Sequence, residues 1–268
     1  MNIFFLGDVV GNSGCKSLKD DLPKIIEKHK IDFVIVNGEN AAQEGVGITE
    51  KVANELFESG VNVITTGNHV WDQKETLDHI EKEKRLLRPN NLIVGSPGKG
   101  FEIYGTKMGL KIGVLNLMGN IFMKKCDDVF ESSSNFLKKN KLGKDYDFLI
   151  VDFHGEITSE KMAIGHYFDG KATLVVGTHT HVPTNDGRIL EMGTAYQTDA
   201  GMCGDYNSVI GMNKENSINR FTKKNSVKHY PAMGEASLCG VIVEANNKTG
   251  LAENIQHFIH GGKLQNTH

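Results

Sequence analysis

Short runs of apolar residues, rich in β-branched and aromatic side chains, recur along the chain and end in glycine and polar residues. Continuous apolar runs of this length are typical of strands that are covered on both faces, as in α/β sheets. Short buried helices would give a similar pattern, because periodicity alone does not separate the two. The pattern predicts buried strands at residues 3–6, 33–36, 61–64, 148–151 and 174–176.

Two stretches between the first three predicted strands have apolar residues at helical spacing, which gives the order β-α-β-α-β. Pro23 lies inside the first stretch. Because an interior proline removes a backbone donor, we expect it to kink or shorten that helix. The apolar positions are Leu18, Leu22, Ile25 and Ile26 in the first helix, and Val52, Leu56 and Phe57 after Thr49 in the second.

After about residue 108 the strand candidates follow one another closely, at 111–117, 194–197 and 238–244, which indicates a second sheet. Two sheets packed face to face with helices outside would bury the apolar faces of both. The chain has no linker-like segment and no abrupt change of composition. We therefore predict an α/β fold of two packed β-sheets flanked by helices, formed by a single domain over residues 1–268.

Charge and cysteine content limit the classes of function. The formal net charge of -3 provides no overall basic field, so stable binding of nucleic-acid duplexes is not expected. The four cysteines lie far apart, which is typical of free thiols in a reducing compartment. The first apolar run is too short for a signal peptide or a membrane span. We expect a cytoplasmic protein without membrane association, and the sequence leaves a homo-oligomer open.

Polar side chains follow the predicted strands, at the positions where open α/β sheets bind ligands. They offer carboxylate, amide and imidazole groups and no thiolate, which favours Mn, Fe, Co or Zn over Ca or Mg. Seven donors exceed the needs of one tetrahedral ion, so two ions are predicted, with Glu39 as the candidate bridge. The candidate ligands are Asp8, Glu39, Asn40, Asn68, His154, His179 and His181.

Each candidate also has an ordinary structural explanation. An aspartate such as Asp8 after a strand is usually a turn former or a helix cap, and a lone histidine such as His154 is usually a hydrogen-bonded core or surface residue. His179 and His181 give a stronger signal, because residues two apart in a strand point to one side. The metal site is favoured by the combination, since independent loops would rarely all carry such donors.

Gly7-Asp8, Gly67-Asn68-His69, His154 and the segment 177–183 resemble, in order and span, the motifs of the calcineurin-like metallophosphoesterase superfamily. Two departures are Val10, where a histidine is common, and Glu39, where the bridging residue is usually aspartate. Both resemble the YmdB-like branch of bacterial phosphodiesterases. Its motifs Gly-Asp-Val-Val-Gly, Gly-Glu-Asn-Ala, Gly-Asn-His-x-Trp-Asp and Gly-Thr-His-Thr-His-Val all occur in this chain.

The resemblance implies a metallophosphoesterase-like four-layer sandwich and hydrolysis of cyclic nucleotides, notably 2',3'-cyclic nucleoside monophosphates. It implies iron as the metal, and manganese or zinc remain alternatives because the same donors accept several first-row ions. It also implies that His69 is not a ligand but the proton donor. By the same resemblance, one ion is held by Asp8, Asn40 and His181, the other by Asn68, His154 and His179, and Glu39 bridges them.

The mechanistic hypothesis is attack of a metal-bridging hydroxide on the phosphorus of a cyclic nucleotide or another small phosphodiester, with His69 protonating the leaving oxygen. A phosphomonoesterase, such as a nucleotidase or protein phosphatase, is a second candidate because the same metal pair serves those reactions. A regulatory metal-binding protein that acts through partners is a third. The intact His69 favours catalysis over the regulatory role.

Overall fold

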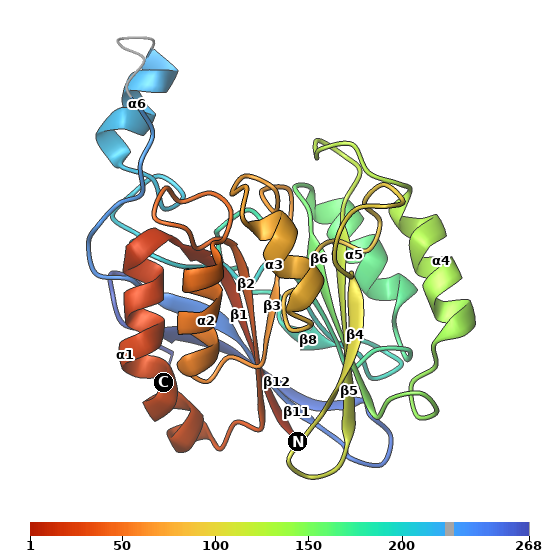
Figure 1. Cartoon of the computed structure of the whole chain (residues 1–268). Coiled ribbons are helices and arrows are strands. Elements are labelled where there is room, and N and C mark those ends of the chain that lie inside the picture. Colours follow the sequence, from red (N-terminus) through yellow and green to blue (C-terminus); the bar gives the residue numbers. More distant parts are fainter. Residues whose placement is uncertain (223–227, 268) are drawn as a thin grey trace.

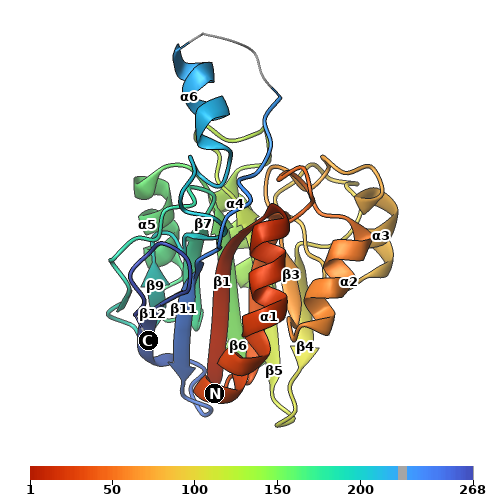
Figure 2. The ribbon, with the colours of Figure 1, turned by 90° about the vertical axis from the view of Figure 1, so that its left-hand side faces the viewer.

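The computed structural model describes residues 1–222 and 228–267. Within these residues the strands form two six-stranded mixed sheets that stand face to face, with helices on their outer sides (Figure 1). The view turned by 90° shows α1 and α2 lying across the outer face of the first sheet (Figure 2). This α/β sandwich confirms the predicted fold class.

The first sheet is built around β1, with the strand order β12-β11-β1-β2-β3. β2 and β10 pair with β1 in parallel and β3 with β2 in parallel, whereas β11 is antiparallel to both β1 and β12. The strands are β1 (Asn2–Val10), β2 (Phe33–Asn40), β3 (Val63–Thr65), β10 (Met202–Cys203), β11 (Leu238–Ala245) and β12 (Ala252–His260).

The second sheet has the order β4-β5-β6-β7-β9-β8. Its inner strands β5, β6, β7 and β9 are parallel, and β4 and β8 are antiparallel edges. The strands are β4 (Phe101–Gly105), β5 (Lys111–Met118), β6 (Phe148–His154), β7 (Leu174–Thr178), β8 (Arg188–Ile189) and β9 (Ala195–Gln197).

The helices complete the layers. α1 and α2 cover the first sheet, α4 and α5 cover the second, and α6 extends away from the sandwich (Figure 1). Of the helices that the structure describes, none is both long and apolar enough to cross a membrane. Their bounds are α1 (Gly11–His29), α2 (Glu50–Glu58), α3 (Thr76–Lys82), α4 (Val129–Lys139), α5 (Thr158–Tyr167) and α6 (Lys214–Thr222).

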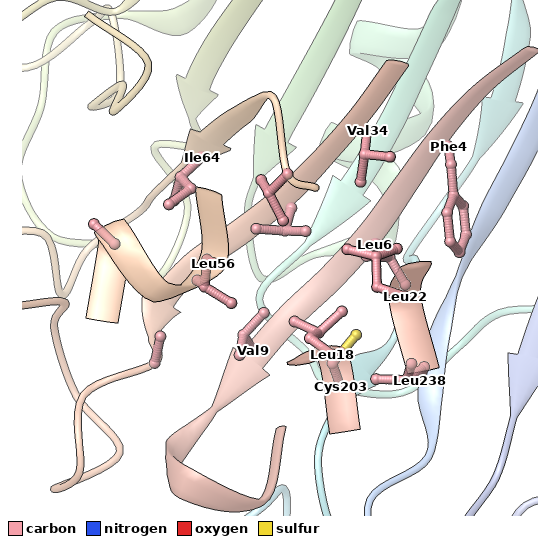
Figure 3. Packing of buried hydrophobic residues seen from close by; sticks show 14 of the residues in the cluster. Phe4, Leu6, Val9, Leu18, Leu22, Val34, Leu56, Ile64, Cys203 and Leu238 are labelled. Atoms are coloured by element: carbon pink, nitrogen blue, oxygen red, sulfur yellow. The ribbon is translucent and has the colours of Figure 1, made fainter. Parts of the chain in front are cut away.

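Alternate side chains of the central strands enter different cores. Phe4 and Leu6 of β1 belong to the cluster between α1 and the first sheet, together with Leu22 (Figure 3). Ile3 and Phe5 belong to the cluster between the two sheets. Successive strand residues point to opposite faces, so a strand covered on both faces needs apolar residues at every position. This requirement explains the continuous apolar runs of the sequence.

The assignment of residues 238–244 to the second sheet was wrong. These residues form β11, which pairs with β1 in the first sheet, Leu6 opposite Gly240 and Asn2 opposite Glu244. The apolar pattern identifies a buried strand but carries no information about a pairing partner more than 200 residues away in the chain.

Pro23 does not shorten α1, which continues past it to His29, so this part of the expectation was wrong. Pro23 is exposed, whereas Leu22 and Ile25 are buried on the opposite face. Burial of two such side chains contributes roughly 3–6 kcal/mol, which offsets the roughly 3 kcal/mol that an interior proline costs. Packing of the helix against the sheet therefore outweighs the missing backbone hydrogen bond.

The cysteines are free, as the sequence predicts. Cys203 and Cys239 are buried in the structure, and Cys15 and Cys126 are partly exposed. Cys203 packs within the cluster between α1 and the first sheet (Figure 3), so it acts as a small apolar side chain there.

Replacement of Leu22 should measure the importance of the α1 contact. Leu22→Ala removes a fully buried side chain, so we expect the free energy of unfolding to fall by about 2–5 kcal/mol. Lys19→Ala, on the exposed side of the same helix, should change it by less than about 0.5 kcal/mol. Denaturant unfolding measures both, and equal effects would contradict the described packing.

Candidate metal centre

The predicted ligands come together at the carboxyl ends of parallel strands from both sheets. β1, β2 and β6 carry some of them directly, and the loops after β3 and β7 carry the others. Because the sheets face each other, these ends meet at one edge of the sandwich. By element they are Asp8 on β1, Glu39 and Asn40 on β2, Asn68 after β3, His154 on β6, and His179 and His181 after β7.

His154 lies at the centre of one group of donors. Its Nε2 atom is 2.9 Å from Glu39 Oε1 and 3.1 Å from both Asn68 Oδ1 and His179 Nδ1. The potential ligand atoms of Glu39, His154 and His179 all lie within 4.8 Å of one another. This group contains the three residues that the resemblance assigns to one ion.

Asp8, Asn40 and His181 form a second, adjacent group. His181 Nε2 is 3.7 Å from Asp8 Oδ1 and 3.3 Å from the Asn40 amide oxygen, with the amide oriented so that its nitrogen faces Glu39. The Asn40 amide also approaches Glu39 Oε1 to 3.2 Å. Glu39 therefore contacts both groups, which is the position that a bridging carboxylate requires. The ligand roles themselves remain predictions.

His179 and His181 lie beyond the end of β7 at Thr178, so the argument from strand spacing was wrong. Both have left-handed backbones, with φ of 100° and 65°. Such conformations are strained for residues with a Cβ and require support from their surroundings. The backbone N–H of His179 donates to Asp8 Oδ2 at 3.0 Å, and His181 Nδ1 contacts the Ile210 carbonyl at 2.8 Å.

Gly67 allows the loop after β3 to approach the centre. A Cβ on this residue would lie 2.2 Å from His154 Cδ2 and 2.5 Å from Glu39 Oε2. Both distances are shorter than any van der Waals contact, so only glycine fits without displacing a candidate ligand. The close approach brings Asn68, the next residue, within reach of His154.

Opposite charges and burial set the protonation of the centre. Burial works against the charge of Glu39, but His154 and then His69 lower the pKa of Glu39 to about 2. Burial also disfavours charge on His154, yet Glu39, Asp8 and Asp152 raise its pKa to about 9. Burial and the neighbouring His154 lower the pKa of His179 to about 3. His179 is therefore a neutral imidazole, the form that binds metals.

The residues of the centre fit metal cations. Asp8 Oδ1 is fully buried and has no hydrogen-bond partner among the described residues. A buried carboxylate oxygen without a partner is energetically costly unless a cation compensates it. His154 Nε2 and His179 Nδ1 also face each other at 3.1 Å, together with oxygen atoms of Glu39 and Asn68. Imidazole, carboxylate and amide donors suit first-row divalent ions.

His69 lies beside the centre and is partly exposed. Its backbone N–H donates to Glu39 Oε2 at 3.0 Å, and its Nδ1 atom is 2.6 Å from Asp72 Oδ2. Lys124 Nζ lies 3.4 Å from Asp72 Oδ1 and donates to the Asn68 carbonyl at 2.6 Å. Asp72 thus fixes the His69 ring, and Lys124 ties this loop to the segment after β5.

The sequence analysis did not identify several residues that contact the centre. Asp72 lies inside the Gly-Asn-His-x-Trp-Asp motif, so a role for it could have been suggested. Glu156, whose Oε2 atom is 3.1 Å from His179 Nε2, and Lys124 stand in segments without a recognisable pattern. Carboxylates and carbonyls behind histidine ligands commonly orient the ring, so Glu156 is a positioning candidate.

Asp152, two residues before His154, is buried and forms hydrogen bonds with residues of both sheets. It accepts hydrogen bonds from Asn37 Nδ2 at 2.9 Å and from Thr178 Oγ1 at 2.7 Å. Burial raises the pKa of Asp152 to about 6, so at neutral pH most of the carboxyl group is ionised. The hydroxyl of Thr178 also contacts His154 Nδ1 at 2.9 Å.

A cavity of about 770 Å³ lies apart from the metal centre, between α4 and the segment that contains Arg88 and Lys99. None of the predicted ligands lines it. The Arg88 guanidinium donates to backbone carbonyls of Pro89, Ser96 and Pro97. Arg88 is therefore held by its own loop, and the cavity does not contribute to the centre.

Comparison with known proteins agrees with the motifs. The family profile described as YmdB-like protein matches residues 4–258. A Bacillus subtilis (strain 168) protein named 2',3'-cyclic-nucleotide 2'-phosphodiesterase is 44% identical over 259 residues, 97% of each chain.

Two solved structures have the same fold with a TM-score of 0.90 and 38% identity. One is a hypothetical protein from Thermus thermophilus, for which the match covers 98% of this chain and 100% of that one. The other is described as a novel phosphatase from Mycoplasma pneumoniae, with 97% and 93% covered. The chain belongs to the YmdB-like protein family.

Proposed function

We propose that this protein is a dinuclear metal-dependent phosphoric diester hydrolase that acts on cyclic nucleotides, in particular 2',3'-cyclic nucleoside monophosphates. The observation that carries the proposal is the convergence of two groups of donors that share Glu39, with His69 beside them. The name of the Bacillus subtilis relative supports the choice of substrate.

The two groups assign the residues that would hold the ions. Asp8, Asn40 and His181 would bind one ion, and Glu39 would bridge to the other, held by Asn68, His154 and His179. Two bound ions lower the pKa of a water nucleophile and neutralise charge on the phosphoryl oxygens. The proposal includes iron as the native metal, with manganese or zinc as substitutes.

His69 would donate the proton to the ribose oxygen that leaves phosphorus. A departing alkoxide is strongly basic, so protonation as the bond breaks speeds its departure. Asp72 binds the Nδ1 side of the ring, which leaves Nε2 for the substrate. The hydrogen bond from the His69 backbone to Glu39 fixes the distance between this ring and the centre.

A phosphomonoesterase is the second candidate function. The Mycoplasma pneumoniae structure described as a phosphatase favours it, since that protein shares the fold and 38% identity. Hydrolysis of 2',3'-cyclic AMP and of a nucleoside monophosphate under the same metal separates the two candidates. Preference for the monoester would overturn the diesterase proposal.

We further propose that residues 1–268 act as one domain in the cytoplasm. The cluster between the two sheets joins strands from both halves of the chain, which supports a single unit. The free cysteines are consistent with a reducing compartment.

Glu39→Ala should remove metal and activity together. The variant lacks the carboxylate that contacts both groups of donors, so we expect fewer than two ions per chain and loss of 2',3'-cyclic AMP hydrolysis. Elemental analysis and a turnover assay measure these effects. Glu44→Ala, at an exposed position in the following loop, should match the wild type. Full activity of metal-free protein would reject the dinuclear mechanism.

His69→Ala should separate catalysis from metal binding. We expect nearly unchanged metal content and a kcat lower by a factor of about 10² to 10⁴, the usual contribution of general acid catalysis. The exposed His166 on α5 provides the control, and His166→Ala should keep wild-type turnover. A matching loss of metal in His69→Ala would assign a structural role to this residue.

Metal uptake should become tighter as the pH rises from 7 to 9. In the metal-free chain the pKa of His154 is raised to about 9, so at pH 7 a metal ion must displace a proton from this ring. The apparent Kd for Mn²⁺ should fall by up to about tenfold per pH unit and level off above pH 9. Calorimetric titration between pH 7 and 10 measures it, and a flat profile would contradict the assignment.

A further inference from the structure

A buried series of hydrogen bonds connects the first sheet to His154 through Asp152 and Thr178. Asp152 and Thr178 are fully buried on the neighbouring strands β6 and β7. Asp152 accepts from Asn37 at 2.9 Å and from Thr178 at 2.7 Å, and Thr65 also donates to it. Thr178 Oγ1 then contacts His154 Nδ1 at 2.9 Å. These hydrogen bonds end on His154 Nδ1, whereas Nε2 on the other side of the ring faces Glu39, Asn68 and His179.

The donor and the acceptor of each of these hydrogen bonds follow from the chemistry of the groups. Asp152 Oδ2 accepts from Asn37 and Thr65, and Asp152 Oδ1 accepts the single hydroxyl proton of Thr178. The Thr178 oxygen can then offer only lone pairs to His154 Nδ1. A contact of 2.9 Å requires a proton between the two atoms, so Nδ1 is the donor. In the neutral ring Nε2 therefore carries the lone pair.

Asn37 holds the carboxylate in place from the opposite sheet. Its Oδ1 atom accepts the backbone N–H of Glu39 at 3.1 Å, which fixes the orientation of the amide and directs Nδ2 to Asp152. One side chain thus connects the backbone of the bridging candidate Glu39 to the carboxylate that orients Thr178. The same hydrogen bonds connect the two sheets and orient the hydroxyl group next to His154.

We propose that Thr178 and Asp152 are positioning residues that keep a proton on His154 Nδ1 and thereby present Nε2 as a lone-pair donor to the metal centre. The part of this inference that concerns metal binding rests on the proposed function. The position of the proton on His154 does not, because the hydrogen bonds of the protein itself determine it. Residues that orient a histidine ligand typically affect metal affinity by 10- to 100-fold.

Thr178→Val tests the proposal, because valine keeps the shape of threonine and removes its hydroxyl. With Zn²⁺ as the probe, we expect the variant to bind one of two ions about 10- to 100-fold more weakly than the wild type. Thr178→Ser restores the hydroxyl and should bind Zn²⁺ within about threefold of the wild type. Competition with a chelator gives the affinities. Thr178→Val with wild-type affinity, or Thr178→Ser as weak as valine, would overturn the proposal.

Thr173→Val is the matched control. Thr173 is also fully buried, immediately before β7, and its hydroxyl bonds the Gly250 carbonyl at the opposite end of the strand. This variant should lose stability without a change in Zn²⁺ affinity. If Thr178→Val only loses stability in the same way, Thr178 has a structural role and the proposal is wrong.

Imidazole ¹⁵N NMR provides a second measurement that does not depend on metal. Above pH 9, where the ring is neutral, His154 Nδ1 should carry the ring proton in the metal-free wild type and in Thr178→Ser, and Thr178→Val should lose this preference. Absence of that proton in the wild type would refute the proposal even if Thr178→Val does not fold. If the wild type shows the proton but binds no Zn²⁺, the proposed function fails and the positioning of His154 stands.

Discussion

The apolar contact between the two sheets determines where the candidate metal ligands meet. Ile3 and Phe5 of the first sheet and Ile150 of the second belong to the same buried cluster. This packing holds the carboxyl ends of β1, β2 and β6 against one another. Imidazole nitrogen and carboxylate oxygen atoms then approach to about 3 Å at the end of an otherwise apolar interface. Such an arrangement is stable only with protons or cations between them.

The polar residues between the sheets connect this packing to the chemistry. Buried polar groups are tolerated when each is hydrogen-bonded, and a connected network fixes one arrangement more strictly than apolar packing does. Asn37 and Asp152 meet across the interface at 2.9 Å, so the sheets have a defined register where the candidate ligands lie. The unpaired oxygen of Asp8 is an exception, and it points to the position where a cation would compensate it.

The sequence was most informative where burial imposes a pattern. β1 and β2 are covered on both faces and appear as continuous apolar runs, and the residues after such runs supplied most of the candidate ligands. Sheet membership of β11 could not be predicted, because its pairing with β1 spans most of the chain. The helix through Pro23 was predicted from its apolar positions, but its continuation past the proline could not be, since local preference opposes it and tertiary packing stabilises it.

The contacts behind the candidate ligands were the least predictable part of the site. His179 and His181 were chosen because they follow a predicted strand, but the strand spacing that strengthened this choice does not apply to them. Both residues have left-handed backbones instead. Glu156 and Lys124 reach the site from loops whose paths depend on the whole fold. Asp72 and Thr178 stand inside recognisable motifs, but only the structure shows which atoms they contact.

Anomalous X-ray diffraction from crystals of the Mn²⁺-loaded protein tests the central claim most directly, because it locates each ion independently of activity. The account predicts two peaks separated by roughly 3.5–4 Å, one next to Asp8, Asn40 and His181 and the other next to Asn68, His154 and His179, with Glu39 between them. A single peak, or peaks away from these side chains, would contradict it.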